Sequence, residues 1–98
     1  MALVFKTLVI TDLTHHASVE SVTGKVKFQI GESSETRQGL DQFVIVDAVV
    51  PAGPDESLRE VRGKLLDRAV AVLQAVVGAA ADGGLEAQAG LKEPPQVN

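Results

Sequence analysis

Two adjacent histidines are one group of residues in this sequence whose side chains could bind a metal ion. His15 and His16 lie between the carboxylates of Asp12 and Glu20, and imidazole combined with carboxylate can bind a divalent metal ion. Neighbouring residues of an extended chain point in opposite directions, so the pair cannot simply chelate one ion. We therefore expect His15 and His16 to lie in a solvated turn. They remain the only metal-ligand candidates, and we expect no cofactor.

A carboxylate in an apolar segment is the second candidate. Asp47 interrupts the run of residues 43–50, which is otherwise apolar. Burying it without a partner is costly, and its pKa would rise toward the range used in acid–base catalysis. Arg62, one turn after Leu58 on a predicted helix, could pair with Asp47 if that helix covers the same face of the sheet. We favour this ion pair, within one chain or between two chains, over a catalytic role.

Other catalytic and cofactor motifs are missing from the sequence. None of its serines lies in a Gly-x-Ser-x-Gly turn, and none of its nine glycines forms a dinucleotide or phosphate-binding loop. The chain contains no cysteine, which excludes disulfides, thiolate catalysis and cysteine-ligated metal centres. Serine hydrolase and nucleotide-binding functions therefore have no support in the sequence.

The net charge and the hydropathy of the chain argue against nucleic acid and membrane as its partners. The net charge is −4, and the chain has three phenylalanines as its only aromatic residues. A nucleic-acid interface needs positive charge and, on a sheet, aromatic side chains for stacking. No window reaches the roughly 18 apolar residues that a membrane-spanning helix requires. We expect a cytoplasmic protein that binds neither nucleic acid nor membrane.

Three segments have the pattern of β-strands. Residues 3–12 are rich in β-branched and large apolar side chains, and residues 22–30 alternate apolar with polar, which indicates one buried face. Gly24 in the second segment marks either a bulge or a close backbone approach. Residues 43–50 are nearly all apolar, which is typical of a strand covered on both faces. A polar connection, residues 31–41, separates the last two segments.

One long helix is predicted after the strands. Ser57 and Glu60 have the spacing of a capping box, and apolar residues then recur at steps of three and four. Beyond Gly78 the residues become small and polar, with two adjacent prolines, as in a flexible tail. The sequence thus predicts an α+β domain over residues 1–78, in the order β-β-β-α, with the helix on one face of an antiparallel sheet and a flexible tail over residues 79–98.

The third strand predicts self-association. One helix can cover only one face of a sheet, yet residues of both faces of this strand are apolar. Phe43, Ile45 and Val49 share a face with Asp47, and in a monomer one of the two faces would be left exposed. A second copy related by a two-fold axis would cover it. The alternative is that the tail, or a fourth strand within residues 33–40, folds over this face.

Two functional hypotheses follow. The first is a non-catalytic module that assembles into a homo-oligomer or binds a protein or peptide partner, because an exposed strand edge can accept an extended segment through backbone groups alone. The second is a small enzyme or ligand-binding protein whose site lies at a subunit interface and uses His15 or His16 with Asp47 and Arg62.

Overall fold

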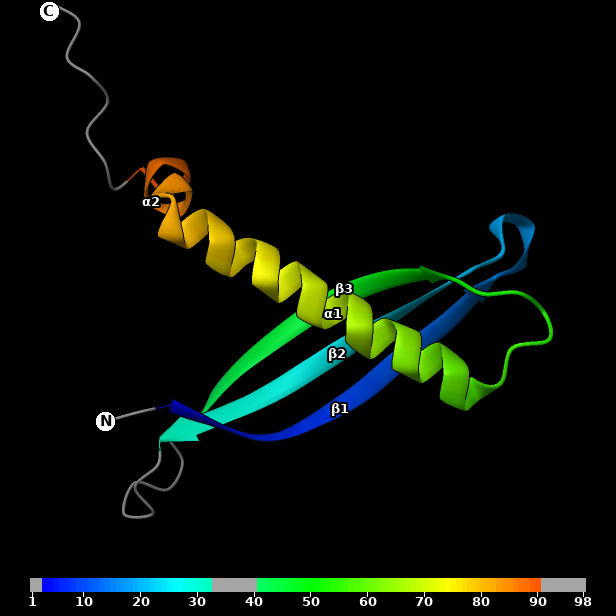
Figure 1. Ribbon diagram of the computed structural model, residues 1–98. Helices are drawn as coiled ribbons and strands as arrows, with labels where there is room; N and C mark the ends of the chain where they lie inside the picture. The colour runs from blue at the N-terminus through cyan, green and yellow to red at the C-terminus, as the bar shows by residue number, and fades with distance from the viewer. Residues whose placement is uncertain (1–2, 33–40, 91–98) are drawn as a thin grey trace, which may run out of the picture.

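The strands precede the helices along the chain. The computed structural model describes residues 3–32 and 41–90. Its elements are β1 (Leu3–His16), β2 (Ser21–Glu32), β3 (Gln42–Pro51), α1 (Leu58–Ala81) and α2 (Gly84–Gln88). Figure 1 shows α1 lying across the three strands, with α2 at its end. The predicted α+β fold with β-β-β-α order is confirmed.

The sheet is antiparallel with the strand order β1-β2-β3, so β1 and β3 are its edges. A single 3-10 turn, Ala17–Val19, connects β1 to β2. The pairing of β2 with β3 is continuous from Ser21 opposite Pro51 to Ile30 opposite Gln42. The pairing of β1 with β2 is interrupted twice, between Phe5 and Thr7 and between Thr11 and Thr14. The two edges of the sheet therefore differ in regularity.

Helix α1 begins at the predicted cap. The Ser57 hydroxyl accepts a hydrogen bond of 3.1 Å from the backbone N–H of Glu60, which satisfies one of the free amides of the first turn. Val61, Leu65 and Ala69 of α1 are buried against the sheet. The core also contains a set of strand residues on the same face: Val22, Val26, Phe28, Val46, Ala48 and Val50. This one layer of helix on sheet forms the hydrophobic core.

Gly24 of β2 lies beside side chains from both α1 and β1. A Cβ atom at this position would lie 2.9 Å from Leu65 Cδ1 and 3.0 Å from Leu13 Cδ2, which is closer than ordinary van der Waals contact. The register interruption at Thr11 and Thr14 lies directly opposite Gly24. Both predicted reasons for this glycine, a bulge and a close approach, are present.

The described elements are longer than the sequence pattern predicts. β1 continues through His16, so both histidines belong to the strand and not to the turn. α1 continues to Ala81 and α2 follows it, so residues 79–90 of the predicted tail are largely helical. The proposed fourth strand (residues 33–40) and the end of the tail (residues 91–98) lie outside the described residues. No helix within the described ranges is long and apolar enough to cross a membrane.

Candidate interaction surfaces

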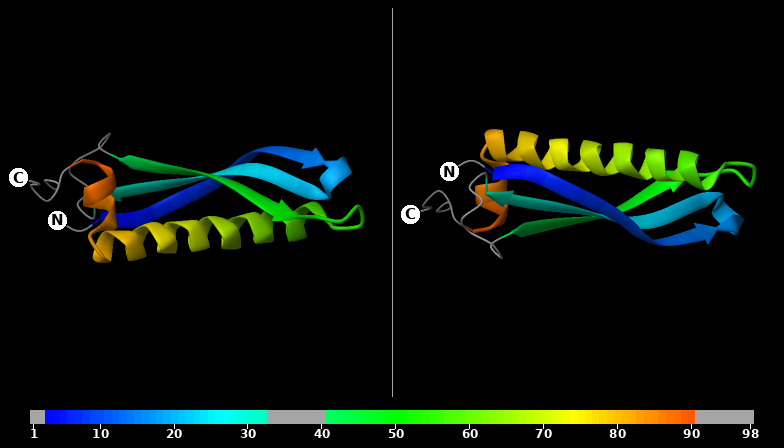
Figure 2. Two further views of the ribbon diagram at one scale, coloured as in Figure 1. Left: turned by 90° about the horizontal axis from the view of Figure 1, so that it is seen from above. Right: turned by 90° about the horizontal axis from the view of Figure 1, so that it is seen from below.

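The face of the sheet opposite α1, here called the open face, carries an exposed apolar cluster. Figure 2 shows α1 along one side of the sheet and no element along the other. Phe43, Ile45 and Val49 of β3 are each more than half exposed on this open face, and so is Val9 of β1. The alternation along β3 produces this arrangement, because Val46, Ala48 and Val50 point toward α1 and are buried. The three predicted apolar residues therefore do share one uncovered surface.

Two lysines of β2 lie among these apolar side chains. Lys27 Nζ lies 4.5 Å from the centre of the Phe43 ring, in the geometry of a cation–π contact. Lys25 Nζ lies 3.2 Å from Asp47 Oδ1, and both side chains are exposed. Exposed ion pairs contribute little to stability, roughly 0–1 kcal/mol. These contacts instead place two positive charges and one negative charge at fixed positions on the open face.

The expected pair between Asp47 and Arg62 does not form within one chain. The Asp47 side chain is 76% exposed and contacts Lys25 on the open face, whereas Arg62 is an exposed residue of α1, on the other side of the sheet. No polar or charged residue is buried in the described part of the chain. The intrachain prediction is wrong because Asp47 is an odd-numbered residue of β3 and α1 packs on the even-numbered face. A pair between two chains stays a prediction.

A second polar cluster lies at one end of the sheet. Lys6 Nζ donates a hydrogen bond of 2.9 Å to Asp41 Oδ1, and the Gln29 amide donates to Asp41 Oδ2. The hydrogen bond from Lys6, and then that from Gln29, lower the pKa of Asp41 below its ordinary value of 3.8. This cluster therefore stabilises the fold at pH values above 3.8, and the stabilisation is lost as the pH falls through the lowered pKa. A side chain at Gly31 would collide with both Lys6 and Asp41.

The two histidines point to opposite faces of the sheet. His16 Nε2 is within hydrogen-bond distance, 3.3 Å, of Thr23 Oγ1. His15 pairs with Val22, a core residue, and lies on the α1 side. No group of three or more metal-binding side chains occurs among residues 3–32 and 41–90. Within one chain, His15 and Asp47 also lie on different faces, so they do not converge on one cavity with Arg62.

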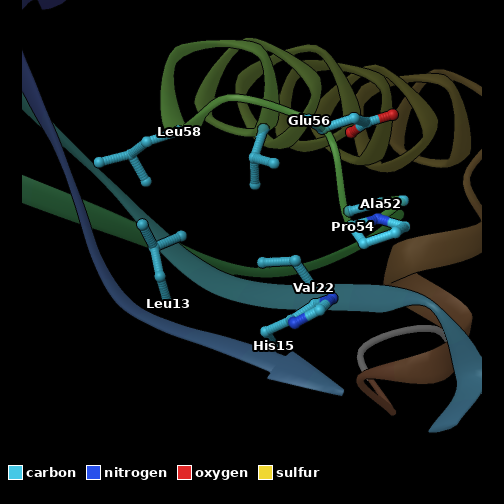
Figure 3. A pocket seen from close by; sticks show the side chains of 9 residues that line it. Leu13, His15, Val22, Ala52, Pro54, Glu56 and Leu58 are labelled. Carbon is cyan, nitrogen blue, oxygen red and sulfur yellow. The ribbon is translucent and has the colours of Figure 1, made fainter. Parts of the chain in front are cut away.

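A small cavity lies beside His15, between the end of the sheet and the start of α1. Its volume is about 280 Å³, and its lining is mostly apolar: Leu13, His15, Val22, Ala52, Gly53, Pro54, Glu56, Leu58 and Val61. Figure 3 shows His15 and Glu56 on opposite sides of it. The Glu56 carboxylate is paired with Lys64, which also donates 3.0 Å to the Pro51 carbonyl. The lining offers a space for an apolar group and no nucleophile beside a base.

Sequence reasoning missed an exposed part of α1. Val72, Val76 and Val77 lie in the C-terminal half of the helix and are exposed, although the apolar periodicity predicted one buried stripe. The sequence did contain a signal for this surface, because the apolar stripe of the helix is wider than a contact with one sheet requires.

Comparison of the chain with protein-family models, with curated proteins and with solved structures found no match. The interpretation of function therefore rests on these surfaces.

Proposed function

We propose that this chain is a non-catalytic assembly module that forms a homo-oligomer through the open face of its sheet. The observation that carries the proposal is that Phe43, Ile45 and Val49 are each more than half exposed on a face that no described element covers. Contiguous exposed apolar surface of this kind marks an interaction site, because leaving it in water costs free energy.

The charges on the open face support a second copy as the partner. Lys25 and Asp47 lie beside each other on neighbouring strands. In a two-fold interface the same patch meets itself, so Lys25 of each copy can face Asp47 of the other. The apolar side chains of β3 then pack together while both charges remain paired. A surface with one sign of charge would repel its own copy.

Replacement of Ile45 tests this proposal. Ile45→Asp places a carboxylate in the middle of the cluster, and Lys27 lies directly opposite it on β2, so the isolated chain tolerates the change. We expect light scattering coupled to size exclusion to give a multiple of the 10.3 kDa chain mass for the natural sequence and a smaller multiple for Ile45→Asp.

A matched control is Ala75→Asp, which adds the same charge to an exposed position of α1, on the other side of the sheet from the cluster. Ala75→Asp should keep the particle mass measured for the natural sequence. A natural chain that is monomeric at all concentrations, or an Ile45→Asp variant with unchanged mass, would contradict assembly through the open face.

A further inference from the structure

Helix α1 carries two apolar rows, and the sheet accounts for only one of them. The first row faces the sheet and consists of Val61, Leu65, Ala69, Val72 and Val76. The second row consists of Leu66, Val70, Leu73 and Val77, at steps of four, three and four. With 3.6 residues per turn, the second row lies roughly 100° around the helix from the first. Steps of four and three are the spacing of a seam between two helices.

The second row has no complete partner in the described residues. Val77 is 68% exposed and Val70 is also exposed, while Leu66 and Leu73 pack only partly against the core. An apolar row on the solvent side of a helix is not expected for a helix that packs against one sheet alone. Its spacing therefore points to another helix as the missing partner.

The sheet-facing row also continues beyond the sheet. Figure 1 shows the C-terminal half of α1 running past β3, the edge strand. Leu65 is 0% exposed where the helix crosses the sheet, whereas Val76, further along the same row, is 46% exposed. The apolar underside of α1 is thus long enough for a wider sheet, one that extends beyond β3.

The β3 edge is suited to such an extension. Its pairing with β2 is regular throughout, with no register interruption. The β1 edge, in contrast, has two register interruptions, Lys6 at one of them and Asp12 with a positive φ at the other. Bulges and charges are the devices that protect edge strands from pairing. The protected edge is therefore β1, and β3 is the edge open to another strand.

An uncovered region on the α1 side of the sheet completes the arrangement. Leu3 and Phe5 are exposed at the start of β1, and Phe5 contacts the core residue Phe28 with ring centres 6.4 Å apart. The helix of the same chain leaves this corner bare. A second helix lying beside α1 would cover it.

We propose that a second copy of this chain joins along β3, so that two three-stranded sheets form one six-stranded sheet with both α1 helices on the same face. The inference rests on the proposed assembly function and names its second interface. A two-fold axis perpendicular to the sheet makes β3 antiparallel to its copy and aligns the two helices antiparallel. Leu66 then faces Val77 of the second copy, and Val70 faces its Leu73.

The charge on β3 constrains the register of this pairing. An axis through Asp47 would place two carboxylates directly opposite each other, which is destabilising. An axis through Val46 instead places Ile45 opposite Asp47 and Phe43 opposite Val49 of the other copy. The same sequence thus pairs with itself without a clash of charge.

A single substitution in the second row tests the helix contact. Val77→Asp alters a residue that is mostly exposed in one chain, so the monomer fold tolerates it, but the proposed seam would bury its charge. We expect light scattering to give half the particle mass that the natural sequence gives. Ala75→Asp, an exposed change in the same turn on the far side of α1 from the row, should keep the full mass. Unchanged mass in Val77→Asp would overturn the inference.

Cysteine cross-linking tests the register without destabilising the chain by charge. The natural sequence has no cysteine, so Leu66→Cys and Val77→Cys each introduce one thiol. After subunit exchange in a mixture and mild oxidation, we expect a disulfide-linked pair that contains one copy of each variant. Either variant oxidised alone should give far less product. A mixture that gives no more product than the separate variants would contradict the antiparallel seam.

The two interfaces can fail separately. Val9→Asp tests the open face alone, because Val9 lies on that face in β1, opposite Lys27 and away from the β3 edge. A reduced mass in Val9→Asp with an unchanged mass in Val77→Asp would contradict the β3 and α1 interface and leave the open-face assembly supported. The opposite result would support the β3 and α1 interface and remove the open-face proposal. A monomeric natural chain would overturn both, and an extended peptide added to β3 would then be the occupant to test.

Discussion

At the residue scale, small side chains decide how closely the elements approach. Gly24 is buried beneath Leu65 and Leu13, and it lies opposite the interruption in β1. Its φ angle is ordinary for a strand, so the requirement for glycine here comes from space and not from backbone strain. Gly63 of α1, in contrast, has open space around it, and nothing in the packing requires a glycine there.

Gly24→Val should therefore destabilise the fold by about 1–3 kcal/mol, because the added atoms force α1 or the β1 bulge away from β2. Gly63→Ala is the control, and we expect it to stabilise the helix by about 1 kcal/mol. Urea unfolding followed by circular dichroism measures both. A Gly24→Val variant as stable as the natural chain would mean that Leu65 and Leu13 move away without cost.

At the element scale, local contacts determine where α1 begins. Ser57 caps α1, and the Lys64 ammonium ties the start of the helix to the end of β3 through the Pro51 carbonyl and Glu56. These contacts set the position of α1 over β2 and β3. From this fixed start, the C-terminal half of α1 runs past β3 (Figure 1).

Loss of the cap should weaken α1 measurably. We expect Ser57→Ala to lower the free energy of unfolding by about 1 kcal/mol, because the Glu60 amide loses its acceptor. Ser57→Asp keeps an acceptor and adds a negative charge at the positive end of the helix dipole, so it should retain the stability of the natural chain. Equal unfolding midpoints for Ser57→Ala and the natural chain would show that solvent satisfies this amide equally well.

At the scale of the whole molecule, the two proposed interfaces use different surfaces. Pairing along β3 leaves the open face of the six-stranded sheet uncovered, and the α1 helices lie on its other side. Two such dimers can then pack through their open faces, with Phe43, Ile45 and Val49 of each chain at the contact. The assembly expected from both interfaces is a four-chain particle with two-fold axes.

The double variant Val9→Asp with Val77→Asp changes one residue of each interface and tests this scheme as a whole. Each single variant should give a particle with half the mass of the natural assembly, and the double variant should give a folded monomer. Light scattering measures the mass, and circular dichroism confirms that the monomer keeps its secondary structure. A double variant no smaller than the single variants would show that the two substitutions disrupt the same interface.

The sequence by itself determined the elements and their order. The alternation in β2, the apolar run of β3 and the Ser57 cap each depend on neighbours a few residues away, and local patterns specify such features. They also identified Phe43, Ile45 and Val49 as residues of one face. The sequence placed the ends of the elements less accurately than the elements themselves. β1 includes both histidines because its pairing with β2 extends to Ser21.

Only the tertiary structure decided which face α1 covers. Both faces of β3 are apolar, so the pattern along the strand could not assign Asp47 to the open face or exclude its pairing with Arg62. The sequence pattern also did not predict how far α1 extends past β3, because that length depends on the angle at which the helix crosses the sheet. That crossing separates the buried row at Leu65 from the exposed residues at Val76 and Val77. Packing between segments that are far apart in the sequence determines these features, and local sequence patterns do not predict it.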